Sequence, residues 1–370
     1  MIYFDSAATT LQKPESVYAA VQRTMRACAS VGRGGHAAAD AAARVVYACR
    51  TEAAELFDAV PEQVVFTMNA THGLNIALRS LVRPGGRVVL SGMEHNAVTR
   101  PLAALGAQIE TADAPPFAPE RLLEGFARAL QQGADAAVCT HVSNVYGNVL
   151  PVSAVAALCR ERGVPLVIDA SQSAGTLPVR LHGTGAAFIA MPGHKGLYGP
   201  QGTGLLLCGA AGEPLLQGGT GSNSLDQSMP DFLPDRHEAG THNVCGIGGL
   251  LAGLRFVRER RPEELLAVER ALTALAARGL RQLPGVEVFT GPGQSGVLSF
   301  RCRDLDCEEA AARLAEAGIA VRAGLHCAPM AHRSGGTLET GTVRVSFSAF
   351  NTSAEVRQFL QVCRTAFLPG

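Results

Sequence analysis

The segment "VPLVIDASQSAG", residues 164–175, decides the fold of this 370-residue chain. It begins with a nearly continuous apolar run, and Asp169 stands where that run ends. Continuous apolar runs of this length, rather than alternating ones, are typical of a strand that is buried on both faces of a sheet. An acid at the carboxyl end of such a strand lies where open α/β sheets bind ligands, although a helix N-cap is the other interpretation of Asp169.

Similar β-rich runs lie on both sides of this segment and alternate with amphipathic, helix-like stretches. They occupy residues 63–67, 87–91, 107–111, 135–143, 186–190 and 202–208. Strands that alternate with helices predict an α/β fold, with a mostly parallel seven-stranded sheet covered on both faces. The Gly-rich stretch 217–235 has no periodicity, and we expect a long functional loop there.

After about residue 245 the pattern changes to one long helical segment followed by short strands and helices. Pro262 interrupts that helical segment, where a kink or break is expected. We therefore expect a large domain over residues 12–250, a smaller α+β domain over 251–370, and an N-terminal arm over 1–11.

Composition excludes several classes of protein. The 32 basic and 32 acidic residues balance, and no basic stripe offers a surface for nucleic acid. No run approaches the roughly 20 apolar residues of a membrane span, and "MIYFDSAATT" does not resemble a signal peptide. A cytoplasmic location is expected. The ten cysteines include no CxxC pair, and most stand in apolar settings where a reduced thiol behaves as a small hydrophobic group.

The segment "MPGHKGLYGPQGTG", residues 191–204, places Lys195 among glycines just after an apolar run. Such a lysine can have a lowered pKa that suits Schiff-base chemistry, although a surface lysine in a Gly-rich loop is the alternative. Pyridoxal phosphate needs a lysine for its aldehyde and an acid that keeps its pyridine nitrogen protonated. Lys195 and Asp169 are such a pair, each at a predicted strand end.

Other predicted strand ends carry residues suited to the same cofactor. A helix predicted to start near Thr71, in "FTMNATHGLNIAL" (66–78), offers its N-terminus to a phosphate. His95 can stack on a flat ring or can be an ordinary loop histidine. Asn144 follows a further strand.

The late stretch "RAGLHCAPMAHRSGGTLETGTVR", residues 322–344, leaves three interpretations of Cys327: a core thiol, a zinc ligand or a nucleophile. His326 and His332 are near, but no cysteine pair at ligand spacing accompanies them, which disfavours zinc. Arg322, His326 and Arg344 can supply positive charge that lowers the pKa of a thiol. Arg344 also suits bidentate recognition of a carboxylate.

Taken together, these motifs resemble a known family. The chain resembles the class V, fold-type I pyridoxal-phosphate enzymes and, within them, the cysteine desulfurases and selenocysteine lyases. The resemblance covers essentially the whole chain and rests on motifs in this order: "YFDSAATT", "GRGGHAAAD", "EHNAV", "HVSNVYG", "IDASQSAG", "GHKGLYGPQGTG", "HEAGTHN", "HCAPMA" and "VRVSFSAFNT".

The resemblance implies pyridoxal 5'-phosphate as cofactor and a role for each matching residue. Lys195 would hold the cofactor and move the Cα proton, and Cys327 would be the nucleophile. The remaining expected roles are pairing with the pyridine nitrogen (Asp169), contact with the ring hydroxyl (Gln172), ring stacking (His95), phosphate binding (Ala70 backbone, Thr71 and His194), phosphate binding in a neighbouring subunit (Thr241) and substrate binding (Asn144, Arg344 and His36). The role of Thr241 requires a homodimer.

Two departures from the family pattern remove hydroxyls from the expected phosphate site: Pro192 stands where Ser is common, and Ala70 where Thr is common. A milder one is Ser6 in place of Asn. Cys327 stands only 17 positions before Arg344. This short spacing resembles the short-loop group, whose members pass sulfur from a near-cofactor cysteine to a partner protein.

L-Cysteine desulfuration is the leading hypothesis for the reaction. Selenocysteine lyase activity, another class V reaction (transamination, epimerisation or β-elimination) and a non-catalytic binding role remain alternatives at this point.

Overall fold

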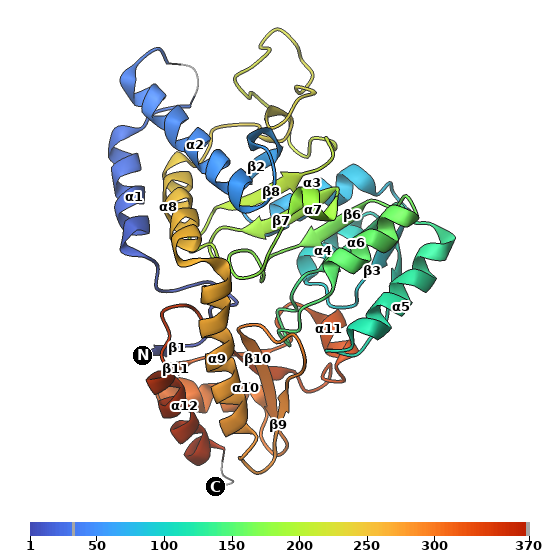
Figure 1. Cartoon of the computed structure of the whole chain (residues 1–370), viewed down its shortest axis with the longest axis vertical. Helices are drawn as coiled ribbons and strands as arrows, with labels where there is room; N and C mark the ends of the chain where they lie inside the picture. Colours follow the sequence, from blue (N-terminus) through green and yellow to red (C-terminus); the bar gives the residue numbers. More distant parts are fainter. Residues whose placement is uncertain (32–33, 368–370) are drawn as a thin grey trace.

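The protein folds into two parts built around separate sheets, as seen in the computed structural model, which describes residues 1–31 and 34–367 (Figure 1). The larger part contains a central sheet with helices on both sides, and the smaller part lies below it in the view of Figure 1. The N-terminus lies beside the smaller part. No helix in the described ranges is long and apolar enough to span a bilayer.

The central sheet has seven strands, as predicted, in the order β2-β8-β7-β6-β5-β3-β4. Neighbours from β7 to β4 pair in parallel, whereas β8 pairs antiparallel with both β7 and β2. The strands are β2 (Val64–Thr67), β3 (Arg87–Leu90), β4 (Gln108–Thr111), β5 (Ala136–Thr140), β6 (Leu166–Asp169), β7 (Phe188–Pro192) and β8 (Gly204–Cys208). All seven coincide with the runs predicted from the sequence, to within a few residues at each end.

Successive residues of the buried strands face opposite sides of the sheet, and both sides are apolar. On β6, Val167 belongs to one hydrophobic core, while Leu166 and Ile168 belong to the other. The helices of this part are α1 (Glu15–Ala27), α2 (Ala37–Leu56), α3 (Ala70–Leu81), α4 (Asn96–Ala104), α5 (Pro119–Ala129), α6 (Val152–Glu161), α7 (Leu181–Thr184) and α8 (Val244–Arg260). Burial on both faces explains why these strands read as continuous apolar runs.

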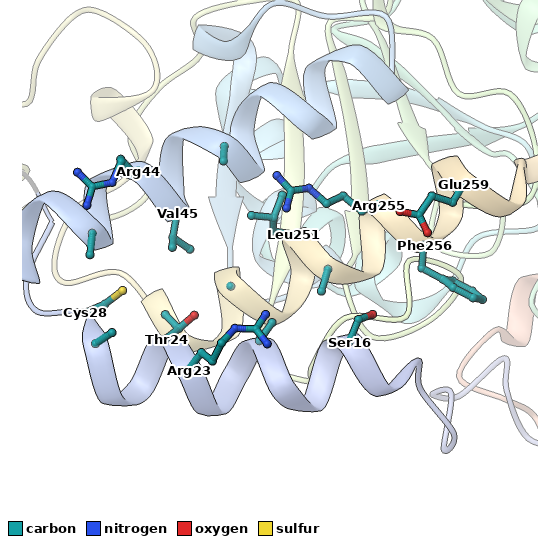
Figure 2. A pocket seen from close by; sticks show the side chains of 16 residues that line it. Ser16, Arg23, Thr24, Cys28, Arg44, Val45, Leu251, Arg255, Phe256 and Glu259 are labelled. Carbon is teal, nitrogen blue, oxygen red and sulfur yellow. The ribbon is translucent and has the colours of Figure 1, made fainter.

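Helix α8 lies between α1 and α2, and a groove of about 540 Å³ opens among the three helices (Figure 2). Gly248 and Gly253 allow the close packing of α8, because a Cβ at Gly248 would collide with Thr24 and one at Gly253 with the carbonyl of Leu197. Residue 250, the expected domain boundary, therefore falls inside α8. The chain leaves this helix at Arg260 and begins α9 at Pro262, where the sequence predicted a break.

The smaller part is an α+β unit with its own core. An antiparallel sheet of order β12-β13-β10-β9 packs against helices. Its elements are α9 (Pro262–Leu280), β9 (Val286–Phe289), β10 (Val297–Cys302), α10 (Cys307–Glu316), β11 (Ile319–Ala320), β12 (Arg322–Gly324), α11 (Pro329–Ser334), β13 (Thr342–Ser346) and α12 (Ser353–Ala366). Strand β1 (Ile2–Tyr3) pairs with β11, so the start of the chain is attached to this part.

Between β8 and α8 the chain forms neither strand nor α-helix. Residues 209–243 contain one short 3-10 helix, Asp235–His237, and are otherwise turns and irregular segments. The stretch 217–235, predicted as a long loop, lies within this region.

Candidate active site

The carboxyl ends of β5, β6 and β7 meet at one edge of the central sheet and border a cavity of about 190 Å³. Parallel strands place their carboxyl ends at the same edge, which is why residues far apart in the sequence meet here. Eight of the residues predicted for the site line this cavity: Ala70, Thr71, His95, Asn144, Asp169, Gln172, His194 and Lys195.

Lys195 and Asp169 form the charged centre of the cavity. Asp169 is only 3% exposed, and its Oδ1 accepts a hydrogen bond from the Ser171 amide at 2.9 Å. Burial lowers the pKa of Lys195 to about 8; Asp169 opposes this shift and Arg344 adds to it. The chain contains only one other lysine, Lys13. Lys195 thus has the shifted pKa that an amine nucleophile needs near neutral pH.

His95 caps α4 beside this pair, and its Nδ1 accepts a hydrogen bond from the Ala97 amide at 3.0 Å. Burial lowers its pKa, against the effect of Asp169, so the ring is neutral at physiological pH. A neutral, partly buried ring is suited to stacking on a flat cofactor.

The turn before His95 depends on Glu94, a residue that sequence reasoning missed. Its fully buried carboxylate accepts hydrogen bonds from the backbone amides of Ser91 (3.0 Å) and Gly92 (2.8 Å) and from the Ser91 hydroxyl. Gly92 has φ +84°, which suits glycine. The polar "SGMEH" turn after an apolar strand was the available signal.

The end of the cavity where the sequence predicts phosphate binding is the N-terminus of α3. Asn69 caps this helix by accepting from the His72 amide at 2.9 Å. The backbone amides of Ala70 and Thr71 donate no hydrogen bond to any part of the chain that the structure describes, as expected for a first helical turn that offers them to an anion. Pro192, the last residue of β7, lines the same cavity without a hydroxyl.

Arg344 is only 2% exposed and links the two parts of the molecule. Its Nη1 donates to the Asn144 carbonyl at 2.9 Å, and its Nη2 donates to Asp5 Oδ1 at 2.8 Å. Within the described residues, Arg344 Nε and Asn144 Oδ1 are buried without a hydrogen-bond partner. Buried polar groups are normally paired, so these two atoms mark a place for a polar ligand.

Cys327 is exposed, whereas the preceding His326 is 7% exposed. The Asn144 side chain donates to the His326 carbonyl at 2.8 Å, and the Asn96 amide donates to the Cys327 carbonyl at 2.7 Å. These two bonds hold the cysteine turn against Asn96, the residue after His95, and against Asn144, which lines the cavity. Burial and the nearby Arg344 lower the pKa of His326 to about 2, so His326 is neutral and cannot supply the positive charge expected of it. Arg322 and Arg344 remain as possible sources.

Four of the expected residues do not line this cavity: Cys327, Arg344, His36 and Thr241. Arg344 and the turn of Cys327 are bonded to the cavity residue Asn144, whereas His36 and Thr241 lie elsewhere in the single chain. His36 is exposed at the N-terminus of α2, where its Nδ1 accepts from the Ala39 amide at 3.3 Å. Thr241 is exposed and lines a separate cavity of about 180 Å³ near the start of α3.

The N-terminal arm is a further part of the site that sequence reasoning did not assign. The Ala7 carbonyl accepts from Gln172 Nε2 at 3.0 Å, and Thr9 Oγ1 lies 3.1 Å from His194 Nδ1. The arm thus fixes two cavity residues. Across residues 1–31 and 34–367, no group of three or more His, Cys, Asp or Glu side chains is arranged to hold a metal ion.

An α/β architecture with a partly buried lysine and a buried acid at the carboxyl edge of a mostly parallel sheet is that of the fold-type I class of lysine-dependent enzymes. A model of the aminotransferase class-V family matches residues 2–359, and the chain belongs to that family.

Cysteine desulfurases from other organisms are similar to this protein over nearly its whole length. A probable cysteine desulfurase of Methanothermobacter thermautotrophicus is 32% identical over 96% of this chain and 92% of its own length. A cysteine desulfurase of Klebsiella pneumoniae is 32% identical over 96% of this chain and 91% of its own length. The solved apo structure of cysteine desulfurase from Thermococcus onnurineus superposes with a TM-score of 0.90, at 32% identity over 98% of this chain and 94% of that one.

Proposed function

We propose that the protein is a pyridoxal-phosphate-dependent cysteine desulfurase, which converts L-cysteine to L-alanine and retains the sulfur as a persulfide on Cys327. The observation that carries this proposal is the meeting of three groups. The Lys195–Asp169 pair occupies the cavity, Arg344 with its unpartnered Nε lies at the junction of the two parts, and Cys327 stands on a turn bonded to Asn96 and Asn144. The names of the relatives support the same activity.

The cavity residues fit pyridoxal phosphate. Lys195 would hold its aldehyde carbon, Asp169 its pyridine nitrogen, His95 the face of its ring and the N-terminus of α3 its phosphate. The hydroxyl of Thr140, buried and without a partner among the described residues, also faces this cavity. When bound, the cofactor supplies an electron sink for negative charge that develops on the substrate carbons. The hydroxyls absent at Ala70 and Pro192 leave the phosphate more dependent on backbone amides.

The protein's own groups then divide the work. Arg344 binds the substrate carboxylate through Nε, while Asp5 and the Asn144 carbonyl hold its two terminal nitrogens in place. Lys195 Nζ, with its lowered pKa, takes the proton from Cα and can return a proton to the product. Asp169, at the end of β6, would pair with the pyridine nitrogen and stabilise positive charge there.

Cys327 performs the step specific to this reaction. Its thiolate Sγ forms a sulfur–sulfur bond with the substrate sulfur, and the Cβ–S bond breaks. The electron pair left on Cβ takes up a proton, so L-cysteine and the enzyme thiol give L-alanine and an enzyme persulfide. The sulfane sulfur is then available to an acceptor. Because the segment between Cys327 and β13 is short, we expect a separate protein to take the sulfur at the cavity, rather than a long mobile loop to carry it away.

Three further expectations belong to the same proposal. Thr241 reaches the phosphate site of a second copy, so the active form is a homodimer. His36, at the N-terminus of α2, contributes to substrate binding from a position outside the cavity of its own chain. The enzyme works in the cytoplasm.

The test is to incubate the reconstituted protein with L-cysteine, to measure alanine, and to map the persulfide by mass spectrometry. Cys327→Ala should abolish alanine formation from cysteine. Cys28→Ala, which changes a partly exposed cysteine beside the α1–α8 groove, should not. Pyruvate and ammonia, a keto acid, or undiminished turnover by Cys327→Ala would each contradict the proposal.

A further inference from the structure

The turn that carries Cys327 has an unusual backbone. His326 has φ +48° and Cys327 has φ +56°, so two consecutive residues with side chains occupy the left-handed region. This region is unfavourable for residues other than glycine and is kept only where the surroundings impose it. The turn closes with a hydrogen bond from the Ala328 amide to the Leu325 carbonyl at 2.9 Å. Something must therefore hold these two residues in place.

The two side chains of the turn point to different environments. The imidazole of His326 is buried, whereas the thiol-bearing side chain of Cys327 is exposed. His326 Nε2 lies 3.2 Å from the Thr342 carbonyl oxygen and 3.1 Å from the Thr342 hydroxyl. A carbonyl oxygen can only accept, so Nε2 carries the proton. The imidazole thereby ties the turn to β13, two residues before Arg344.

The main chain of the turn is held from the opposite side by the large part of the molecule. The Asn144 side chain donates to the His326 carbonyl, and the Asn96 amide donates to the Cys327 carbonyl. Both donors belong to elements that border the cofactor cavity. The turn is thus fixed at three points: Thr342 holds the imidazole, and Asn144 and Asn96 hold the carbonyls.

Direct acid–base participation by His326 does not account for this arrangement. Its ring is buried among His332, Thr342 and Arg344, and burial holds its pKa far below neutral. It can neither charge the surroundings of Cys327 nor exchange protons with it at physiological pH. Its remaining contribution is mechanical.

We propose that His326 is a positioning residue for Cys327. Its buried imidazole, bonded to Thr342, locks the left-handed turn that presents the thiol beside the cofactor cavity. This inference rests on the proposed desulfurase function and deepens it. Because Thr342 and Arg344 lie on the same strand, the lock sets the thiol in a fixed relation to the group that binds the substrate carboxylate.

The proposal separates reactions that need the thiol from reactions that do not. L-Selenocysteine has a better leaving group than L-cysteine, so its turnover can depend less on the thiol. The rate that Cys327→Ala retains with each substrate measures the part of turnover that is independent of the thiol. A residue that acts only through Cys327 should affect cysteine turnover and spare the thiol-independent part of selenocysteine turnover. A residue needed for the cofactor or for folding should lower both.

The experiment uses the pyridoxal-phosphate-loaded enzyme and two variants, His326→Ala and His326→Asn. Asparagine tolerates the left-handed region but cannot reach Thr342 as histidine does, so it tests the imidazole apart from the backbone preference. For both variants we expect cysteine kcat to fall by about tenfold or more, a cost typical of a misplaced reacting group. The KM for cysteine and the thiol-independent selenocysteine turnover should stay within about twofold of the original, because neither depends on the position of the thiol.

The matched control is His237→Asn, which changes another buried histidine, whose Nε2 bonds the Ala211 carbonyl rather than the turn. It should affect cysteine and selenocysteine turnover in the same proportion. If both His326 variants retain full cysteine kcat while Cys327→Ala loses it, the positioning role is wrong and the desulfurase mechanism stands. A proportional loss of both substrates in the His326 variants would also overturn it. Retained cysteine turnover in Cys327→Ala would instead contradict the proposed function itself.

Discussion

The two halves of the active site are built in different ways. Lys195, Asp169 and His95 stand at or just after the carboxyl ends of buried parallel strands, and their positions follow from the sheet. Cys327 is an exposed residue on a turn of the smaller part. The position of this turn depends on hydrogen bonds from Asn96 to the Cys327 carbonyl and from Asn144 to the His326 carbonyl, and Asn144 and His326 are 182 positions apart in the sequence.

This difference assigns distinct tasks to the two regions. The sheet edge surrounds Lys195 with a low-dielectric environment that lowers its pKa. Groups that act on the α-carbon discriminate little between amino acids with different side chains. In the proposed mechanism, the turn provides Cys327, the group that makes sulfur transfer possible. Changes at the sheet edge should therefore abolish every reaction, whereas changes at the turn should affect only those that use the thiol.

The largest effect is expected for Lys195→Ala, which should lower turnover of both cysteine and selenocysteine by on the order of 10⁴-fold or more, as removal of a nucleophile typically does. Borohydride reduction of the loaded enzyme should attach the cofactor to Lys195, as read by peptide mass spectrometry. Lys13→Arg is the control because Lys13 is the only other lysine and its pKa is also lowered to about 8 by burial. A label on Lys13 would contradict the assignment.

Arg344→Lys should raise the KM for cysteine on the order of 100-fold, because lysine keeps the charge but loses the planar set of donors that bonds Asp5, Asn144 and a carboxylate together. The same factor is expected for selenocysteine, since both substrates carry the same carboxylate. Steady-state kinetics with both substrates tests this, and a change limited to kcat would contradict it. This variant probes the contact where the two regions meet.

The sequence predicted the sheet edge well because strand ends are local features. An apolar run that ends in Asp169, and another that ends shortly before Lys195, identify their own positions, and parallel pairing brings them together. All seven strands followed from the same pattern. The helix expected to start near Thr71 was predicted for the same reason, and α3 begins at Ala70.

The sequence could not predict the contacts that cross between the two parts. The pairing of Asp5 with Arg344 joins residues 339 apart, and no periodicity or spacing encodes it. The neutral state of His326 was equally inaccessible, because it results from burial against β13 rather than from neighbouring residues. The left-handed pair at 326–327 contains no glycine, the usual signal for such a turn.

Asp5→Asn should have a smaller effect, raising the KM for cysteine roughly fivefold, as expected for about 1 kcal/mol from one weakened hydrogen bond to a charged partner. Asparagine retains an oxygen for Arg344 Nη2 but not the charge, so the arginine is held less firmly. Asp58→Asn, in the turn after α2, is a control far from this contact. An unchanged or lower KM in Asp5→Asn would mean that Asp5 competes with the substrate rather than orienting Arg344.

The last prediction concerns Glu269 on α9. This residue lies near Tyr198, which follows Lys195 in the chain. Its carboxyl is buried against Gly296 and near Tyr198, and burial raises its pKa from 4.5 to about 8. Between these two values the folded protein holds a proton that the unfolded chain has released, so this group lowers stability as the pH rises from about 5 to 8.

Glu269→Gln, which cannot ionise, should therefore leave the free energy of unfolding unchanged at pH 5 and raise it by about 1–3 kcal/mol at pH 8. Urea unfolding at the two pH values measures the difference, with the exposed Glu263→Gln at the start of α9 as a pH control. Cysteine kcat at fixed pH should change little, because the carboxyl touches neither the cavity nor the turn. A variant that is stabilised equally at both pH values would show that Glu269 is not the group that titrates.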